Sequence, residues 1–238
     1  MQAIILAGGK ATRLQTVLND IPKALASIRN KPFLDYLLQF LNEQGIHHFI
    51  FSLGHQYQQI LDYLQAKEKT WTYECVIEEQ ALGTGGAIKK ALPFASDQHV
   101  WVINADTYLE LNMRTMYQQH INNKAMATIA LKEMEHFDRY GLVNMDESNC
   151  IYTFEEKRSC EKGLINAGFF IVNKDLFLEN AALSEVFSVE KDFFELQLSN
   201  KTIYGFKTDG FFIDIGIPED FEKAQQLLPN LKCTIKLN

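Results

Sequence analysis

Short apolar runs alternate with amphipathic stretches along the first part of the chain. Ala3 to Ala7 form a continuous apolar run that ends at two glycines, which is typical of a strand buried on both faces of a parallel sheet. After Pro32, apolar residues recur at spacings of three and four up to Gly45, and this pattern predicts an amphipathic helix. Further strands are predicted at 48–53, 72–77 and 99–103, and further helices at 57–64 and 84–92. This alternation predicts a doubly wound, mostly parallel α/β sheet that binds its ligands at the carboxyl ends of the strands.

The pattern changes after Ala125, where predicted strands follow one another with short connections. Strands are predicted at 126–131, 142–145, 151–154, 164–172, 202–206 and 211–213, and helices at 174–179, 190–198 and 218–228. We therefore expect the second half of the protein to be mixed. No linker, repeat or low-complexity tract divides the sequence, so we expect one domain over residues 1–238.

Composition and charge narrow the range of partners. The 238 residues are 47% hydrophobic and 22% charged, which is typical of a globular protein with a substantial core. With 23 basic and 30 acidic residues the formal net charge is −7, which disfavours a general nucleic-acid or anionic-membrane binder but permits a small anionic ligand. No run approaches the roughly 20 apolar residues of a transmembrane helix, and no basic leader precedes the first strand, so we expect a cytoplasmic protein. The four cysteines and six histidines lack the spacing of a zinc site or a disulfide framework.

A glycine-rich turn directly after the first predicted strand is the strongest local signal for chemistry. Because Gly8 and Gly9 lack a Cβ, backbone N–H groups in this turn can approach a phosphate chain closely. Thr12 adds a hydroxyl and Arg13 a planar fork for phosphate oxygens. The turn matches neither the Walker phosphate-binding loop nor the dinucleotide fingerprint. The alternative for this segment is a tight turn with solvated basic residues. Lys23 is a further candidate phosphate contact, and the alternative for it is an ordinary surface lysine.

Two other strand ends carry candidate residues for the same crevice. The segment from Glu78 to Ala87 is a second glycine-rich connection, which either faces the ligand or allows a helix to pack closely. Asp106 and Asp214 each follow a strongly apolar strand, and two such carboxylates suit one Mg²⁺ together with substrate phosphates. Taken singly, the favoured role of each aspartate is that of a helix cap or turn residue.

Two polar segments in the second half suit a sugar phosphate. Glu156 offers acceptors to sugar hydroxyls, and Lys157 offers a charge to a phosphate. Gly168, two residues after Asn166, admits a ring close to the backbone. The alternative for the first segment is a solvated acidic and basic turn.

Taken together and in this order, the motifs resemble the sugar-1-phosphate nucleotidyltransferase family over nearly the whole chain. The matching segments are AIILAGGxxTRL at 3–14, DIPK at 20–23, KPFL at 31–34, LGTGGAI at 82–88, NxD at 104–106, FDRYG at 137–141, FEEK at 154–157, NxG at 166–168 and FIDIGIPED at 212–220. Within the family the motifs are most similar to the guanylyltransferases that act on D-glycero-α-D-manno-heptose 1-phosphate. Ala11 and Ala105 stand where many members have glycine, and each adds a methyl group near the ligand.

The resemblance implies a Rossmann-like, GT-A type fold in which residues 1–125 bind the nucleotide and residues 126–238 bind the sugar phosphate. The implied nucleotide contacts are Leu6, Ala7, Gly8, Gly9, Thr12, Arg13, Glu78 and Gly83. The implied sugar-phosphate contacts are Gly141, Glu156, Lys157, Asn166 and Gly168. The implied catalytic residues are Arg13, Lys23 and Asp106, and the implied ligands of Mg²⁺ are Asp106 and Asp214.

The resemblance also implies the reaction. A nucleoside monophosphate passes from a nucleoside triphosphate, with GTP favoured, to a sugar 1-phosphate, with the heptose favoured, for surface polysaccharide synthesis. We expect a monomer or homodimer that binds these two substrates, and neither nucleic acid nor a membrane. The alternatives are a cytidylyl- or uridylyltransferase acting on another phosphorylated acceptor, and a non-catalytic relative that binds a nucleotide or sugar.

Overall fold

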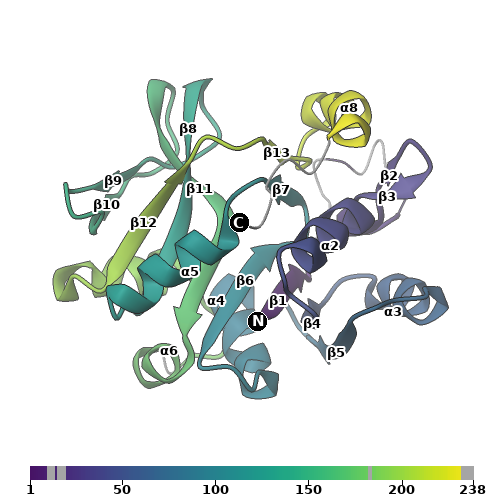
Figure 1. Ribbon diagram of the computed structural model, residues 1–238, viewed down its shortest axis with the longest axis horizontal. Helices are drawn as coiled ribbons and strands as arrows, with labels where there is room; N and C mark the ends of the chain where they lie inside the picture. Colours follow the sequence, from purple (N-terminus) through teal and green to yellow (C-terminus); the bar gives the residue numbers. More distant parts are fainter. Residues whose placement is uncertain (10–13, 15–19, 182–183, 232–238) are drawn as a thin grey trace.

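A seven-stranded sheet forms the centre of the computed structural model, which describes residues 1–9, 14, 20–181 and 184–231. In spatial order its strands are β12 (Ile203–Thr208), β8 (Ala127–Phe137), β11 (Cys160–Asn173), β6 (His99–Asn104), β1 (Gln2–Ala7), β4 (His48–Leu53) and β5 (Thr72–Ile77). All of them run in one direction except β11, which is antiparallel to both of its neighbours (Figure 1). The prediction of a mostly parallel α/β sheet with a mixed second half is confirmed.

The order of the strands reverses beside β1. Helix α2 (Phe33–Glu43) leads from β1 to β4, and helix α3 (Tyr57–Ala66) leads from β4 to β5. Helix α4 (Gly83–Ala91) then crosses the other face of the sheet and leads to β6, which pairs with the free side of β1. A reversal of this kind opens a crevice at the carboxyl ends of the two strands, here β1 and β6.

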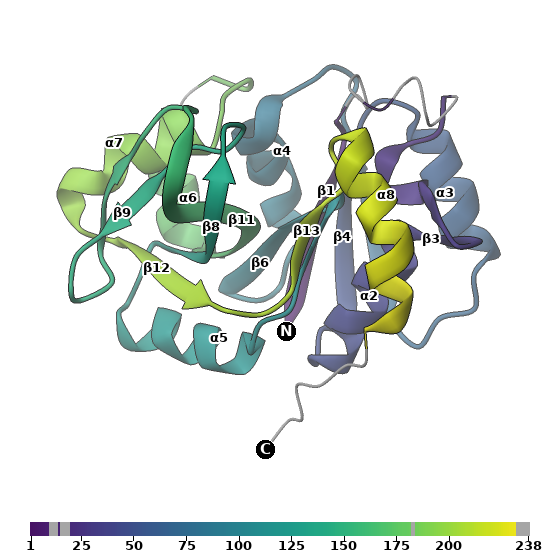
Figure 2. The ribbon, with the colours of Figure 1, turned by 90° about the horizontal axis from the view of Figure 1, so that it is seen from above.

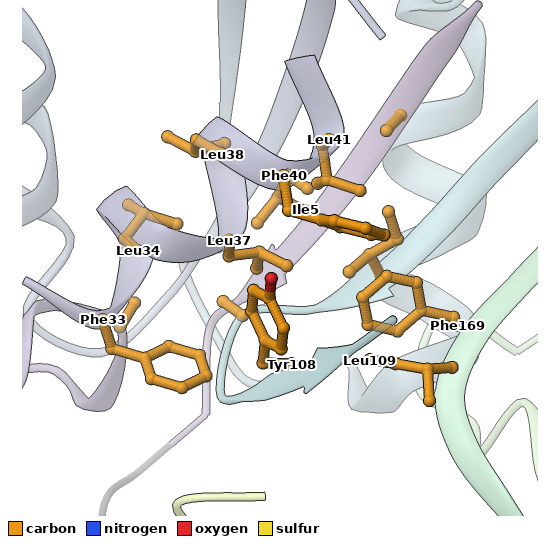
Figure 3. Packing of buried hydrophobic residues seen from close by; sticks show 14 of the residues in the cluster. Ile5, Phe33, Leu34, Leu37, Leu38, Phe40, Leu41, Tyr108, Leu109 and Phe169 are labelled. Atoms are coloured by element: carbon orange, nitrogen blue, oxygen red, sulfur yellow. The ribbon is translucent and has the colours of Figure 1, made fainter. Parts of the chain in front are cut away.

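Two hydrophobic layers cover the sheet, one on each face. Consecutive side chains of β1 enter opposite layers, because the side chains of a strand alternate in direction. Ile5 packs with α2, and Ile4 packs with α4. Figure 3 shows Leu37, Phe40 and Leu41 of α2 gathered over Ile5. Viewed from above, α2, α5 and α8 lie on one side of the sheet and α4 and α6 on the other (Figure 2). These three further helices are α5 (Met113–Asn122), α6 (Lys174–Asn180) and α8 (Pro218–Leu227).

Three two-stranded ladders and several short turns of helix complete the described part of the fold. The ladders pair β2 (Ser27–Ile28) with β3 (Lys31–Pro32), β7 (Thr107–Leu109) with β13 (Phe212–Asp214), and β9 (Val143–Met145) with β10 (Ile151–Phe154). The helical turns are η1 (Lys23–Leu25), η2 (Leu92–Phe94), η3 (Glu190–Phe194), α7 (Glu195–Gln197), η4 (Leu198–Asn200) and η5 (Leu228–Asn230). The helix predicted at 190–198 corresponds to the continuous run from η3 to η4. Within the described ranges, none of the helices has the length and the apolar run that crossing a bilayer requires.

Strands β8 and β11 extend beyond the predicted ranges of 126–131 and 164–172. Their additional residues pair with each other in an antiparallel arm, where Lys162 Nζ lies 2.8 Å from Glu133 Oε1. The arm is held by backbone hydrogen bonds between segments about thirty residues apart, and it lacks the apolar run of a strand buried on both faces. Hydrophobic patterning therefore ends β8 too early and begins β11 too late.

Helix α5 has no counterpart among the predicted elements. Its buried face consists of Met113, Met116 and His120, so a polar residue stands where helical patterning expects an aliphatic one. The helix begins where the Asn112 side chain accepts a hydrogen bond of 3.0 Å from the backbone N–H of Thr115. The Asn112 cap is the sequence signal from which this helix could have been predicted.

His120 lies fully buried between α5 and the sheet. Its Nδ1 is 2.9 Å from Thr128 Oγ1, and its Nε2 is 3.0 Å from His99 Nδ1. Burial, with a smaller contribution from the charge of His99, lowers the pKa of His120 to about 3. The folded protein therefore keeps this histidine neutral, whereas the unfolded chain protonates it near a pH of about 6.5.

We expect the free energy of unfolding to fall as pH decreases below about 6.5, because the unfolded state then binds a proton that the folded state excludes. His120 contributes up to about 1.4 kcal/mol per pH unit over the window down to its folded-state pKa of about 3. Urea unfolding of the wild type and of His120→Gln at several pH values between about 7.5 and about 4.5 measures this contribution. The difference in the free energy of unfolding between the wild type and His120→Gln should become smaller as pH falls. A difference that does not depend on pH would contradict the lowered pKa of His120.

Candidate active site

Two adjoining cavities open at the carboxyl ends of β1 and β6. The larger, the β1 cavity, has a volume of about 970 Å³ and lies between the end of β1 and the start of α4. The smaller, the β11 cavity, has a volume of about 280 Å³ and lies between β11, β13 and the segment that follows β8. Asn104, the last residue of β6, lines both. The two cavities therefore meet where the strand order reverses.

The β1 cavity contains all described residues that the sequence analysis assigned to the nucleotide. These residues are Leu6, Ala7, Gly8, Gly9, Glu78 and Gly83. Lys23 and Asp106 line the same cavity, as does Ala105, whose N–H donates to the carbonyl of Leu6 at 3.1 Å. Ala11, Thr12 and Arg13 lie outside the described residues.

The first glycine-rich turn brings backbone close to the cavity floor. A Cβ on Gly8 would lie 2.8 Å from Glu78 Oε1, so glycine is required for this contact between the ends of β1 and β5. A Cβ on Gly9, by contrast, would meet no atom of the described residues within 4 Å apart from its chain neighbours. Gly9 thus leaves space that a ligand can use.

Glu78 presents a fixed carboxylate to the β1 cavity. Its Oε1 accepts a hydrogen bond of 3.0 Å from Ser52 Oγ, and its Oε2 accepts one of 3.2 Å from the N–H of Leu82. Its own N–H donates to the carbonyl of Leu53 at 2.7 Å, which ties this residue to β4. An ionised carboxylate only accepts hydrogen bonds, so its remaining lone pairs suit a ligand edge made of donors.

The second glycine-rich connection combines the two alternatives that its sequence left open. Gly83 has a φ of +69° and lines the β1 cavity. All three glycines pack against a distant segment. A Cβ on Gly83 would lie 2.5 Å from the carbonyl oxygen of Phe187, the N–H of Gly85 donates to that carbonyl at 3.0 Å, and a Cβ on Gly86 would lie 2.0 Å from the carbonyl oxygen of Glu185. Close packing therefore explains the three glycines, and Gly83 in addition lines the β1 cavity.

The β11 cavity contains all residues assigned to the sugar phosphate, namely Gly141, Glu156, Lys157, Asn166 and Gly168. Asn166 is fixed by its amide, which donates to Glu190 Oε1 at 2.7 Å and accepts from the N–H of Gly168 at 3.0 Å. Gly168 has a φ of +74°, and a Cβ there would lie 2.8 Å from Asn104 Nδ2. The two residues thus shape the wall that the cavities share.

Several further residues line the β11 cavity without having been assigned from the sequence, among them Arg139, Tyr140, Glu190 and Lys191. Arg139 and Tyr140 belong to the FDRYG motif, and this motif is the sequence signal from which they could have been assigned to the site. Glu190 and Lys191 carry no local signal, because only the fold brings η3 to this wall, where Lys191 forms an ion pair with Glu156.

The two aspartates assigned to a metal lie at the junction, one in each cavity. Lys23 Nζ is 3.0 Å from Asp106 Oδ2, and the N–H of Ile215 donates to the carbonyl of Asp106 at 3.0 Å, which holds Asp214 beside it. Burial, and next the charge of Asp106, raise the pKa of Asp214 above its ordinary value.

Two neighbouring carboxylates in a partly buried setting fit a hard divalent cation. Among the described residues no group of three or more His, Cys, Asp or Glu side chains is placed to hold a metal. A cation at Asp106 and Asp214 would therefore take its other ligands from substrate phosphates and water.

The chain belongs to the nucleotidyl transferase family, whose model matches residues 2–230. It is 45% identical to the D-glycero-α-D-manno-heptose 1-phosphate guanylyltransferase of Aneurinibacillus thermoaerophilus, over 96% of this chain and 98% of that protein. It is 39% identical to the corresponding protein of Campylobacter jejuni, over 93% and 97%. The crystal structure of HddC from Yersinia pseudotuberculosis complexed with GMP-PN matches with a TM-score of 0.83 and 34% identity, over 94% of this chain and 98% of that one.

Proposed function

We propose that this protein transfers GMP from GTP to a sugar 1-phosphate, with D-glycero-α-D-manno-heptose 1-phosphate favoured, and releases pyrophosphate. The relatives named above support this choice of substrates. The observation that carries the proposal is the meeting of the two cavities at Asn104, with Asp106 in one and Asp214 in the other. This arrangement allows a triphosphate and a phosphate monoester to lie end to end, as an in-line displacement requires.

In the proposed reaction an oxygen of the sugar phosphate attacks the α-phosphorus of GTP, and the bond from that phosphorus to the bridging oxygen of pyrophosphate breaks. The second pKa of a phosphate monoester is about 6, so the nucleophile is ionised at neutral pH and no general base is required. The protein has to align two anions and offset their charge. Lys23 from the β1 cavity and Lys157 from the β11 cavity supply positive charge on the two sides. Mg²⁺ held by Asp106 and Asp214 would, when bound, neutralise charge on the phosphate oxygens.

The proposal is tested by measuring pyrophosphate release with Mg²⁺ and each of GTP, ATP, CTP and UTP, combined with heptose, mannose and glucosamine 1-phosphates. We expect the highest kcat/KM for GTP with a manno-configured heptose 1-phosphate. Faster turnover with CTP or UTP would favour the alternative base. Tight nucleotide binding without turnover for any acceptor would overturn the enzymatic proposal in favour of a non-catalytic relative.

The fixed carboxylate of Glu78 supports guanine as the base. Guanine presents a ring N–H and an amino group side by side, so it offers two adjacent donors to an acceptor-only group. Adenine and cytosine place a ring nitrogen acceptor beside the amino group, and uracil places carbonyls on both sides of its N–H. A carboxylate held by Ser52 and Leu82 therefore discriminates among the four bases.

Replacing Glu78 with glutamine is expected to lower kcat/KM for GTP by about 100-fold, because a donor replaces one acceptor and a charge-assisted hydrogen bond is lost. The loss should be much smaller for CTP and UTP, so the preference for GTP narrows. Steady-state kinetics with each triphosphate measures the effect. Glu74→Gln is the matched control, since Glu74 lies on β5 outside the cavity. An equal loss with every triphosphate would contradict a role in base selection.

A further inference from the structure

Both carboxylate oxygens of Asp214 are held by hydrogen bonds from the protein. The N–H of Gly216 donates to Oδ1 at 2.7 Å, and the hydroxyl of Tyr140 donates to Oδ2 at 3.3 Å. The backbone of Asp214 is itself paired with Thr107 in the β7–β13 ladder. The rotation of this carboxylate is therefore restricted, and each oxygen keeps lone pairs for a further ligand.

The hydroxyl of Tyr140 is in turn held by an arginine. Arg139 Nη2 contacts both the Tyr140 hydroxyl and Asp220 Oδ2, and the guanidinium carbon lies 4.8 Å from the centre of the tyrosine ring. Asp220 lies in the first turn of α8, where Lys223 Nζ is 2.9 Å from its other oxygen. The aromatic ring of Tyr140 packs between those of Phe137 and Phe212. A chain of contacts thus runs from α8 through the segment after β8 to Asp214.

This chain of contacts has features that a purely structural role does not require. Arg139 Nη1 is buried and, within the described residues, has no hydrogen-bond partner, which costs stability. Tyr140 also directly precedes Gly141, which lines the β11 cavity. The tyrosine therefore connects the wall of that cavity to the carboxylate at the junction.

We propose that Tyr140, oriented by Arg139 and Asp220, is a positioning residue that fixes the Asp214 carboxylate for a divalent cation at the junction of the two cavities. The inference rests on the proposed function, in which Asp106 and Asp214 share that cation. Groups that hydrogen-bond to a metal-binding side chain orient it and raise its affinity, and their removal typically weakens metal binding by about 10- to 100-fold. Tyr140 donates such a hydrogen bond to Asp214, and Arg139 contacts the hydroxyl that donates it.

The substitution Tyr140→Phe tests the proposal, because it removes the hydroxyl and keeps the ring that packs between Phe137 and Phe212. Mn²⁺ binding is measured by electron paramagnetic resonance with a non-hydrolysable GTP analogue, so no turnover is needed. We expect the Kd for Mn²⁺ to rise about tenfold, with a parallel rise in the Mg²⁺ concentration that gives half-maximal activity. Arg139→Lys keeps the positive charge but removes the planar guanidinium that contacts Tyr140 and Asp220. It should raise both the Kd for Mn²⁺ and the Mg²⁺ concentration for half-maximal activity.

The matched control is Tyr36→Phe, which deletes a hydroxyl that donates to the carbonyl of Ile28 at 3.3 Å and lies in neither cavity. This variant should bind Mn²⁺ as the wild type does. Thermal denaturation shows whether Tyr140→Phe and Arg139→Lys are folded. If both folded variants bind Mn²⁺ as the wild type does, the positioning role is overturned and the proposed function stands. If the wild type itself binds no Mn²⁺ with the analogue, the shared cation of the proposed function fails.

Discussion

Asp106→Asn is expected to lower kcat/KM for GTP and the sugar phosphate by about 10³-fold or more. The change removes a charged oxygen from the pair that would hold the cation, and it leaves Lys23 without the carboxylate that lies 3.0 Å away. Asp214, whose pKa burial already raises, would then have to hold the cation alone. Steady-state pyrophosphate release measures the loss.

The control for this substitution is Asp209→Asn, which changes an exposed aspartate outside both cavities. It should leave kcat/KM unchanged. Calorimetric titration of a GTP analogue without divalent cation separates binding from catalysis, and we expect both variants to bind it. An activity of Asp106→Asn within tenfold of the wild type would show that Asp106 is not at the reacting centre.

Gly86→Ala is expected to destabilise the protein by about 3 kcal/mol. The added Cβ would lie 2.0 Å from the carbonyl oxygen of Glu185 and 2.9 Å from Leu82 Cβ, so backbone must move to admit it. Alanine is the better helix former by about 1 kcal/mol, and the steric overlap has to exceed that gain. Urea unfolding measures the difference in the free energy of unfolding.

Gly9→Ala is the matched comparison, because among the residues that the structure describes its Cβ would meet only its chain neighbours within 4 Å. We expect its free energy of unfolding to stay within about 0.5 kcal/mol of the wild type. Its affinity for a GTP analogue should fall, since the methyl group would occupy space in the β1 cavity. Equal stability losses in the two variants would contradict this separation of packing from ligand access.

Most of the fold could be predicted because its central strands are buried on both faces. Such strands read as short apolar runs. Strand β4 begins and ends where the pattern places it, and β6 is one residue longer than predicted. Prediction failed where burial was not the determining force. The arm of β8 and β11 is held by hydrogen bonds between distant segments, and α5 buries His120 in place of an aliphatic residue.

The candidate site shows the same division. Asp106 could be chosen as a candidate because it follows a strongly apolar strand at the edge where a parallel sheet binds its ligands, and the family resemblance added Glu78. Their partners could not be chosen, because Lys23 and Asp106 are 83 positions apart and Asn166 and Glu190 belong to different elements. The contact from Tyr140 to Asp214 likewise joins residues 74 positions apart.

The sequence by itself determined the alternation of strands and helices, the two glycine-rich connections and the set of residues available for chemistry, since each depends on neighbours along the chain. Only the tertiary structure decided that two cavities meet at Asn104, that Gly83, Gly85 and Gly86 pack against the segment at 185–187, and that an arginine and a tyrosine hold Asp214. The physical reason is that hydrogen bonds, steric overlap and charge coupling depend on distances in space, and local sequence patterns fix those distances only within one element.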